Sequence, residues 1–413
     1  MNLRNYIVVT GAYWGFTVTD GALRMLVLLH FFHLGFSPVQ LAFLFLCYEF
    51  FGIVTNLLGG WLGSQMGLRV TLIGGLFLQV VALGLLALLN PGWPEAVSVA
   101  YVMMTQSLSG IAKDLTKMSA KSSIKVLVPN DAKGTLFKWV ALLTGSKNAL
   151  KGVGFFMGGF LLSVAGYAGA LWIMAGALLA VSIGSWLKIP SGMGQTKVKV
   201  RFRQLFSKEP EINVLSAARF FLFGARDIWF VVGVPIFLEG TLKWSFPRVG
   251  SFMALWVIGY GIVQSLAPVL LRGHAPTGVT AARAAFVLAG VVAAVPLALS
   301  TGVPAPTVII AGLALFGIAF AVNSAVHSYL ILEYTAGDKV ALNVGFYYMA
   351  NAGGRLAGCL LSGVLFQLIG LAGCLWGTFA FALVAALIAL RLPRSAVRPE
   401  SLVHAAIKVG DGD

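Results

Sequence analysis

Long apolar runs dominate the sequence, and their length constrains the fold more than any other feature. A helix that crosses the hydrocarbon core of a bilayer needs about 20 apolar residues, and the 413-residue chain contains roughly twelve such runs. Only 10% of the residues are charged, whereas an average soluble domain has about 25%. Because so few charges cannot cover a water-facing surface of this size, the sequence predicts an all-α integral membrane protein.

The apolar runs predict the positions of the membrane spans. They lie at 6–32, 39–63, 70–90, 96–124, 136–163, 168–188, 213–238, 247–271, 280–300, 305–331, 342–369 and 371–391. Asp20 and Arg24 interrupt the first run and no small-residue cleavage site follows it, so we expect a span there rather than a signal peptide. Most connections are short, but a long basic one lies at the midpoint. The predicted organisation is an N-terminal six-helix bundle (1–188), a basic cytoplasmic linker (189–212), a C-terminal six-helix bundle (213–391) and a cytoplasmic tail (392–413).

The distribution of Lys and Arg predicts the orientation in the membrane. One side of the predicted topology carries both termini and most of the basic residues of the connections, namely Arg69, Lys125, Lys133, those between Lys197 and Lys208, Arg272 and Lys339. The other side carries Lys243 and Arg248. Positive residues favour the cytoplasmic side, so we expect both termini in the cytoplasm. The basic residues on this side account for much of the net charge of +15. We expect them to contact anionic lipid headgroups, so the charge does not require a nucleic acid partner.

The two predicted halves repeat each other. GYAGALW (166–172) matches GLAGCLW (370–376) at an offset of 204 residues. The same offset pairs Gly154 with Gly358 and Lys151 with Arg355. Two parallel repeats of six spans, joined by a long central loop, are typical of transporters that bind their substrate near the bilayer midplane between the halves.

Two local motifs point to a family. GWLGSQMGLR (60–69) resembles the loop G-x-L-x-D-R-x-G-R-R of the major facilitator superfamily, although Ser64 and Gln65 replace its Asp and Arg. LKGVGFFMGGF (150–160) resembles the superfamily's antiporter motif through its glycines, although Phe155 replaces its Pro. Glycines in membrane helices also serve close packing. The resemblance implies the twelve-helix fold of this superfamily, with two six-helix repeats.

Charged residues inside the spans are the candidates for a binding site. A lysine at the centre of a membrane helix costs roughly 2.5–3.5 kcal/mol, so such residues usually face an aqueous cavity. Neighbouring charges such as Asp20 with Arg24, or Arg226 with Asp227, are alternatively expected to neutralise each other. Lys121 is expected at the surface. Cations still outnumber acids within the spans, which predicts a substrate with several negative charges, because Arg and Lys both bind phosphate-like groups.

The predicted substrate-binding residues combine these cations with nearby polar side chains, for which core packing is the alternative role. They are Lys113, Lys117, Lys147, Lys151, Arg355, Arg226, Arg24, Asn148, Asn351 and His327. The carboxylates that would carry a coupling proton are Asp20, Glu49, Asp114 and Asp227. The alternative driving force is the membrane potential, which assists an anion leaving the cell by about 2.3 kcal/mol per charge per 100 mV.

Enzymatic and metal-binding functions find no support in the sequence. Cys47, Cys359 and Cys374 are scattered through apolar spans, where cysteines behave as small hydrophobes. No nucleophile–base pair and no cluster of metal-ligand residues stands out. We therefore expect neither catalysis nor a metal or other cofactor.

Longer strings resemble one group within the superfamily. GAYWGFTVTDGALRMLVLLHFF, CYEFFGIVTNLLGGWLG, SGIAKDLTKMSAKSSIKVLVP and TGSKNALKGVGFFMGG are similar to the organoarsenical efflux permeases (the ArsJ type). The resemblance implies export of 1-arseno-3-phosphoglycerate across the bacterial inner membrane, which gives arsenate resistance. A glyceraldehyde-3-phosphate dehydrogenase makes this ester and is the implied functional partner. Pentavalent arsenic in such an ester is a phosphate mimic, which suits cationic ligands rather than thiols.

Two other functions stay open at this stage. The first is transport or exchange of a different small organic phosphate. The second is a membrane sensor that binds the anion without moving it, although the short polar tail after Leu390 offers no signalling domain.

The sequence generates one prediction about the two central lysines. Lys147→Ala and Lys151→Ala are each expected to abolish arsenate resistance, because each removes a cation from the predicted anion site. Resistance is measured by growth of cells expressing each variant, and immunoblotting of membranes verifies that the protein is present. Wild-type resistance in both variants would remove these lysines from the site.

Overall fold

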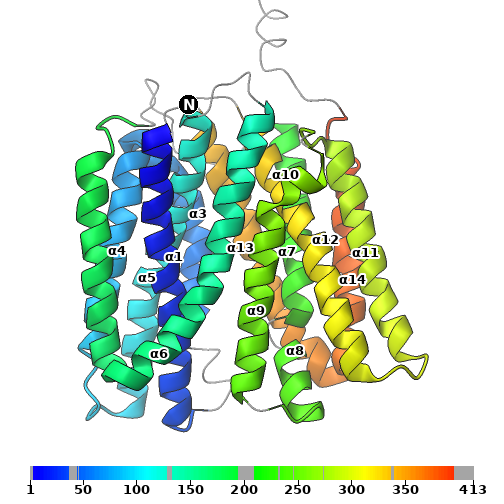
Figure 1. Cartoon of the computed structure of the whole chain (residues 1–413), viewed down its shortest axis with the longest axis horizontal. Coiled ribbons are helices and arrows are strands. Elements are labelled where there is room, and N and C mark those ends of the chain that lie inside the picture. Colours follow the sequence, from blue (N-terminus) through cyan, green and yellow to red (C-terminus); the bar gives the residue numbers. More distant parts are fainter. Residues whose placement is uncertain are drawn as a thin grey trace, which may run out of the picture.

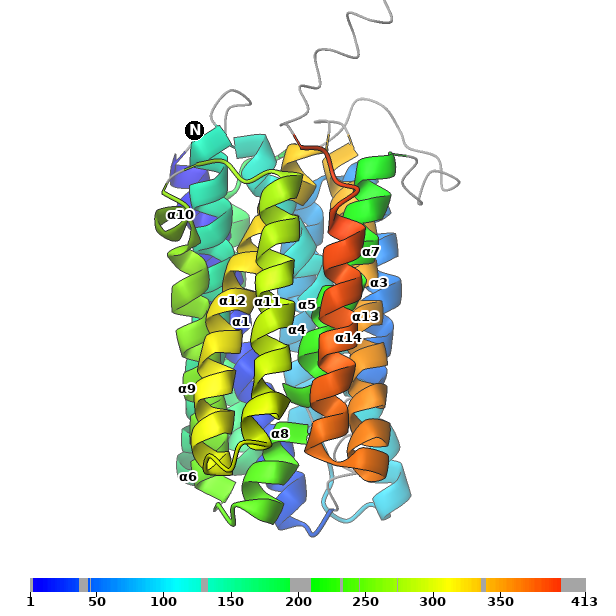
Figure 2. The same cartoon turned by 90° about the vertical axis from the view of Figure 1, so that its right-hand side faces the viewer.

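The computed structural model describes residues 3–36, 44, 46–127, 133–193, 209–230, 233–244, 246–272, 274–335 and 339–394, and its regular elements there are helices. The long ones are α1 (Leu3–His33), α3 (Leu46–Met66), α4 (Leu68–Ala87), α5 (Glu95–Leu127), α6 (Lys133–Lys188), α7 (Pro210–Phe230), α9 (Phe246–Ser265), α11 (Gly278–Leu299), α12 (Ala305–Glu333), α13 (Val340–Ile369) and α14 (Leu371–Ala389). Three short ones are α8 (Gly233–Ile236), the π-helical η2 (Phe237–Thr241) and α10 (Ala267–Leu270). The long helices run roughly parallel to one another as one bundle, which Figure 1 and Figure 2 show from two sides.

Helix α6 contains two of the predicted spans. Its 56 residues correspond to about 84 Å at 1.5 Å per residue, far more than the roughly 30 Å of a bilayer core. Gly166 has φ 66° and ψ −177°, and the chain reverses direction there (Figure 1). With α6 counted as two spans, six long helices precede residue 194 and six follow residue 208 in the described chain, which fits the predicted twelve.

Six of the described helices are long and apolar enough to cross a membrane by composition alone: α4, most of α6, α11, α12, α13 and α14. The other long helices carry the charged residues discussed below, or are interrupted. The predicted span 247–271 is divided into α9 and α10, with a proline near the start of α10. Pro268 has no backbone N–H for a helical hydrogen bond, which explains the break.

The internal repeat appears in the backbone as well as in the sequence. Gly166 and Gly370, which the offset of 204 residues aligns, both have positive φ angles, 66° and 77°. Each lies at the reversal between two spans without an intervening loop. Residues other than glycine rarely adopt this conformation, so the same residue makes the same turn in both halves.

Aligned glycines also bring aligned helices together. A Cβ atom on Gly154 would lie 2.5 Å from the backbone oxygen of Val18 in α1, and one on Gly358 would lie 2.6 Å from that of Gly224 in α7. Real Cβ atoms do not approach oxygens this closely, so both positions require glycine. The contacts set α6 against α1 and α13 against α7, the helix pairs that carry most of the buried charges.

The two halves pack together at the end of the bundle where the N-terminus lies. The larger apolar core combines residues of α1, α4, α5 and α6 with C-terminal-half residues such as Ile212, Ala281, Tyr329 and Val344. These C-terminal-half residues belong to the ends of their helices that lie at the same end of the bundle as the N-terminus (Figure 1). The second apolar core, by contrast, consists of residues from the C-terminal half. The halves therefore share a core at one end of the molecule.

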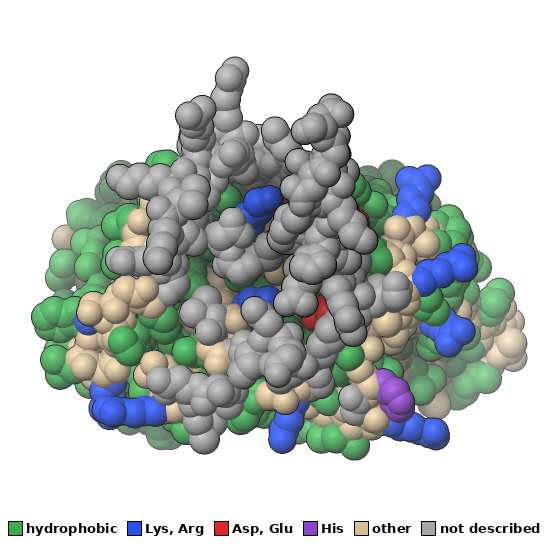
Figure 3. Space-filling view, turned by 90° about the horizontal axis from the view of Figure 1, so that it is seen from above, with side chains coloured by type: hydrophobic (Ala, Val, Ile, Leu, Met, Phe, Trp, Pro, Cys, Tyr) green, Lys and Arg blue, Asp and Glu red, His purple; other side chains and the backbone are tan. Residues whose placement is uncertain are grey.

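The same end of the bundle is basic. Arg4 and Arg69 are the second residues of α1 and α4, Lys188 ends α6, and Arg391 follows α14. Figure 3 views this end and shows Lys and Arg side chains around it, with hydrophobic side chains on the flanks. Most of the predicted linker (194–208) and most of the predicted tail (395–413) lie outside the described residues.

The shared core generates a cross-linking prediction. A Cβ on Gly63 of α3 would lie 3.4 Å from Cβ of Ala341 in α13, close to the 3.5–4.5 Å that a disulfide requires. In a background without Cys47, Cys359 and Cys374, the pair Gly63→Cys and Ala341→Cys is expected to cross-link under mild oxidation, as detected by peptide mass spectrometry.

The matched control moves one cysteine by about one helical turn. Gly59 of α3 faces Leu115 of α5 instead, so Gly59→Cys with Ala341→Cys is expected to stay reduced. Equal cross-linking of both pairs would contradict the described contact between α3 and α13.

Candidate functional site

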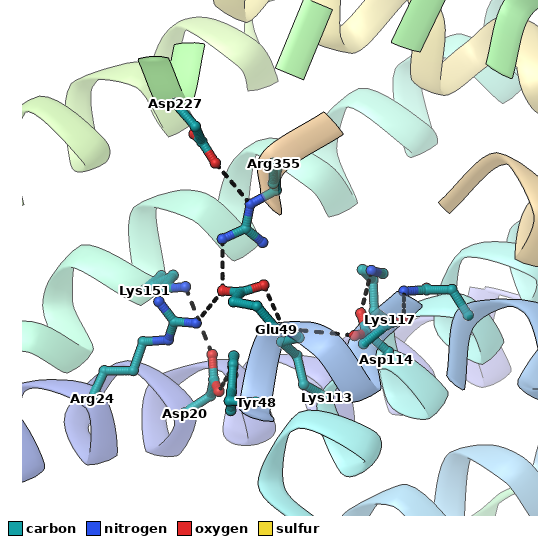
Figure 4. A network of polar contacts seen from close by, with 12 residues as sticks. Asp20, Arg24, Tyr48, Glu49, Lys113, Asp114, Lys117, Lys151, Asp227 and Arg355 are labelled. Atoms are coloured by element: carbon teal, nitrogen blue, oxygen red, sulfur yellow. Dashed lines mark hydrogen bonds and ion pairs between the residues drawn. The ribbon is translucent and has the colours of Figure 1, made fainter. Parts of the chain in front are cut away.

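Charged side chains from both halves converge in one layer inside the bundle (Figure 4). α1 supplies Asp20 and Arg24, α3 supplies Glu49, α5 supplies Lys113, Asp114 and Lys117, α6 supplies Lys147 and Lys151, α7 supplies Arg226 and Asp227, and α13 supplies Arg355. Figure 4 shows most of them pointing toward one another from different helices. The structure thus brings together residues that are up to 335 positions apart.

Two glycines allow α3 and α5 to approach closely enough for this contact. A Cβ on Gly52 would lie 2.5 Å from Oδ2 of Asp114, and one on Gly110 would lie 2.4 Å from the backbone oxygen of Tyr48. Without side chains at these two positions, the α5 charges reach the neighbouring Glu49 of α3. Sequence reasoning assigned no role to these glycines.

Glu49 lies between cations from three other helices. Its Oε1 accepts hydrogen bonds from Nη2 of Arg24 and, at 2.8 Å, from Nη2 of Arg355. Its Oε2 lies 3.6 Å from Nζ of Lys113. Because Arg355 belongs to the C-terminal half, this carboxylate links the two halves by an ion pair.

The aromatic ring of Tyr48 organises the same cluster. Cζ of Arg24 lies 4.3 Å from the ring centroid and Nζ of Lys113 lies 3.9 Å from it. Contacts of this kind attract cations to the ring face. The Tyr48 hydroxyl donates a hydrogen bond to Asp20, and the side chain is fully buried. Tyr48 therefore positions two cations and one carboxylate at once.

The repeat-aligned cations Lys151 and Arg355 have equivalent partners. Nζ of Lys151 lies 3.8 Å from Asp20 of α1, and Nε of Arg355 lies 3.2 Å from Asp227 of α7. Asp227 also pairs with its neighbour Arg226 at 2.6 Å, which is the neutralisation that the sequence left open as an alternative to substrate binding. Each half thus holds the cation of one helix against a carboxylate of the helix packed beside it.

Asp114 is paired within its own helix. It accepts a hydrogen bond from Lys117, and its Oδ2 lies 3.6 Å from Lys113. Lys117 also lies above the ring of Tyr348, 4.3 Å from its centroid. The Asp114 side chain is 2% exposed, so its charge is compensated by these lysines rather than by water.

Three further cations have only neutral hydrogen-bond partners among the described residues. Nζ of Lys121 lies 3.3 Å from the Thr144 hydroxyl, and Nζ of Lys147 lies 3.2 Å from Oδ1 of Asn148. Arg219 donates from Nε to Oδ1 of Asn351 at 2.8 Å. Nζ of Lys121 lies 5.9 Å from the ring centroid of Tyr348, the ring that Lys117 also contacts, and Cζ of Arg219 lies 5.1 Å from that of the adjacent Tyr347. These cations therefore adjoin the others of the layer.

The position of Lys121 corrects the sequence prediction of a surface lysine. It is 2% exposed, because α5 continues to Leu127 and the shared core of the two halves covers this part of the helix. Lys113, Lys117 and Lys121 recur every four residues, a spacing that places them on one helix face. This spacing is the feature of the sequence that indicates a common location of Lys121 with Lys113 and Lys117.

A chain of hydrogen bonds connects Lys147 to Arg219 across the two halves. Asn148 accepts from Lys147 and donates to Oε1 of Gln264 in α9 at 2.6 Å. Gln264 donates in turn to the Ser324 hydroxyl of α12 at 3.0 Å, which also accepts from Arg219 at 3.4 Å. Asn148 and Asn351 therefore lie beside cations of the layer, and their roles in substrate binding stay predictions. The sequence analysis did not single out Gln264 or Ser324.

His327 is the predicted residue with the least evident connection to this layer. It is 1% exposed on α12, and its Nδ1 has no hydrogen-bond partner in the described chain. It lies within electrostatic range of Arg219. The function of all the predicted residues in substrate binding stays a prediction.

The charges of this layer do not balance. The layer contains four carboxylates, Asp20, Glu49, Asp114 and Asp227, and nine cations, Arg24, Lys113, Lys117, Lys121, Lys147, Lys151, Arg219, Arg226 and Arg355. Five positive charges in this described layer are therefore without a counter-charge when all groups are ionised. Several of these side chains keep part of their surface accessible, 25% for Arg355 and 19% for Lys151.

The described residues contain no group of three or more His, Cys, Asp or Glu that could hold a metal ion. The three cysteines are free thiols, with Cys374 buried and Cys47 and Cys359 partly buried.

The sequence over residues 6–277 matches the family model of the Major Facilitator Superfamily. The chain belongs to the major facilitator superfamily. Membership makes it a multi-pass membrane transporter of a small substrate and not an enzyme. No curated protein sequence matches the chain.

Solved structures of superfamily transporters share its fold. The proton:xylose symporter XylE bound to a sugar analogue has a TM-score of 0.74 at 16% identity, covering 95% of this chain and 96% of that chain. The human organic anion transporter MFSD10 has a TM-score of 0.72 at 16% identity, covering 94% and 99%. A bacterial homologue of the iron transporter ferroportin in an outward-facing state has a TM-score of 0.72 at 14% identity, covering 93% and 98%.

The superfamily loop between the second and third spans forms a tight turn here. Gly67 has φ 89° between α3 and α4, which requires glycine. Nη2 of Arg69 donates to the backbone oxygen of Trp186 at 2.7 Å, near the end of α6. The motif residues Gly67 and Arg69 thus connect α3, α4 and α6, while the side chain of Ser64 lies outside the description.

The two contacts of Tyr48 generate a stability prediction. Tyr48→Phe keeps the ring between Arg24 and Lys113 and loses the hydrogen bond to Asp20, at a cost of about 1.5–3 kcal/mol for a bond to a charged group. Tyr48→Leu loses both kinds of contact and is expected to melt at a lower temperature than Tyr48→Phe in detergent. Equal melting temperatures for the two variants would show that the ring contacts contribute nothing.

Proposed function

We propose that this transporter exports a small organic anion with phosphate-like groups, by alternating access of one site between its two halves. The observation that carries the proposal is the excess of five cations in the central layer. Buried charges are stable only when counter-charges and hydrogen bonds compensate them. A substrate with several negative charges supplies the compensation that the protein's own carboxylates do not.

The distribution of the cations favours a substrate with two anionic groups. Lys121, Lys147 and Arg219 have neutral partners, so they are available to one anionic group without displacing a carboxylate. Arg24, Lys113 and Arg355 surround Glu49 and would receive a second. Arginine binds phosphate-like groups through a planar fork and lysine as a point charge, and both types are present in each set.

We propose 1-arseno-3-phosphoglycerate as the substrate that best fits this pattern. The resemblance to organoarsenical efflux permeases supports it, and so does the chemistry, since the ester has one phosphate and one arsenate group. In this proposal a glyceraldehyde-3-phosphate dehydrogenase supplies the ester in the cytoplasm, and its export gives arsenate resistance. The organic anion transporter among the similar structures is compatible with an anionic substrate but shares only the fold.

The basic end of the bundle is proposed to face the cytoplasm of a bacterial cell, with both termini on that side. Residues 1–188 and 213–391 would then be the two bundles that move against each other, with 189–212 as linker and 392–413 as tail. Because the halves share a core at this end, the described state would in this orientation be closed to the cytoplasm. Export in this orientation is assisted by the membrane potential, and Asp20, Glu49, Asp114 and Asp227 are the candidates for proton coupling.

Transport by everted membrane vesicles tests the proposal. Vesicles containing the protein are expected to accumulate the enzymatically generated arsenate ester, and vesicles with Lys147→Ala to accumulate at most about a tenth as much, since loss of a charge contact typically costs 1.4 kcal/mol or more. Vesicles from cells without the protein are the control for leakage.

The same assay with other anions separates the alternatives. Accumulation of glycerol phosphate or hexose phosphate in preference to the ester would favour a transporter or exchanger of another organic phosphate. Binding of the ester without accumulation would favour a sensor and overturn the transport proposal.

A further inference from the structure

Glu49 has the surroundings of a bound anion rather than those of a simple structural carboxylate. Arg24 and Arg355 donate to the same oxygen, Oε1, and Lys113 faces the other oxygen at 3.6 Å. The three cations come from α1, α13 and α5, and they enclose the carboxylate from both halves (Figure 4). Convergent arginines and a lysine are the arrangement that proteins use to bind a phosphate-like group.

The other three carboxylates of the layer lack one or both features that distinguish Glu49. Asp20, Asp114 and Asp227 are 6%, 2% and 2% exposed, whereas 20% of the Glu49 side chain is accessible. Asp114 pairs within its own helix, and Asp20 is held by the Tyr48 hydroxyl. Glu49 therefore combines accessibility with an ion pair between the halves.

We propose that the Glu49 carboxylate takes the place of one anionic group of the substrate when the transporter is empty. The inference rests on the proposed function and assigns a position within that site. An arriving phosphate or arsenate group displaces Glu49 from Arg24 and Arg355, and Glu49 returns when the substrate leaves. The protein thus contains its own competitor for the site.

This exchange determines which kind of transport is possible. An empty carrier must change conformation with its cations uncovered, which is costly in a medium of low dielectric constant. With Glu49 available, Arg24, Lys113 and Arg355 remain neutralised in part during the return. The carrier then returns without a counter-substrate and performs net export. Without this carboxylate, return requires a bound anion and the protein becomes an exchanger.

Reconstituted wild type and Glu49→Gln test the inference. Liposomes are loaded with the arsenate ester, and efflux is measured into buffer with or without external 3-phosphoglycerate. Wild type is expected to show efflux in both buffers. For Glu49→Gln, efflux into anion-free buffer is expected to fall to about a tenth or less, while efflux into buffer with external anion persists. Equal loss of both activities, or full efflux of the variant into anion-free buffer, would overturn the inference.

Binding provides a second and independent measurement. Half-saturating concentrations of 3-phosphoglycerate and of the ester are measured by thermal stabilisation of the purified proteins. If Glu49 covers the site about nine-tenths of the time, its removal is expected to lower the half-saturating concentration about tenfold. Glu49→Asp keeps the charge on a shorter side chain, so it is expected to lie between wild type and Glu49→Gln.

A matched variant separates occupancy of the site from general electrostatics. Asp114→Asn removes one negative charge from the same layer and leaves the contacts of Arg24 and Arg355 intact. It is expected to change the half-saturating concentration much less than Glu49→Gln, and an equal change would overturn the inference while leaving the proposed function in place. If wild type neither binds nor transports the anions, the proposed function fails and the inference fails with it.

Discussion

Transfer of a lysine or arginine to the centre of a membrane costs roughly 2.5–3.5 kcal/mol even on permissive scales, and a bilayer offers no water to relieve it. This constraint governs the arrangement of the charged layer. Carboxylates, aromatic rings and amide side chains surround the cations, and several of these partners come from a neighbouring helix that a close contact holds in place. The glycines at the α3–α5, α1–α6 and α7–α13 contacts allow these helices to approach closely. They therefore determine the distances between the charged side chains of neighbouring helices.

The two halves stabilise their buried cations with equivalent ion pairs, and further contacts connect the two halves. Lys151 with Asp20 in one half corresponds to Arg355 with Asp227 in the other, and both cations lie three residues before a glycine that contacts the partner helix. Glu49 then joins the halves through Arg355, while the amides of Asn148 and Gln264 join them through neutral hydrogen bonds. The first link depends on ionisation and the second does not. An anionic group that displaces Glu49 thus acts directly on the first link.

The apolar pattern of the sequence was sufficient to predict the architecture. Span lengths, the glycine-led repeat and the excess of buried cations all follow from local composition, and the structure confirms the all-helical fold. The partners of the charges were not predictable in the same way, because pairs such as Glu49 with Arg355 lie 306 positions apart and depend on how the halves pack. Lys121 shows this most clearly. Its helix spacing was visible in the sequence, but its burial results from a core that both halves share.

The reversals at Gly166 and Gly370 contain no loop. The two helical segments of each hairpin, called its arms below, are therefore joined directly at one glycine. In α6 the first arm contacts the opposite half, while the second arm presents Trp172, Trp186 and Leu187 with more than half of their surface accessible. In a bilayer these side chains meet lipid. A tilt of the second arm in response to membrane thickness would be transmitted through the hairpin to the boundary between the halves. The absence of a loop at Gly166 therefore connects the arm of α6 with these exposed side chains directly to the arm that contacts the other half.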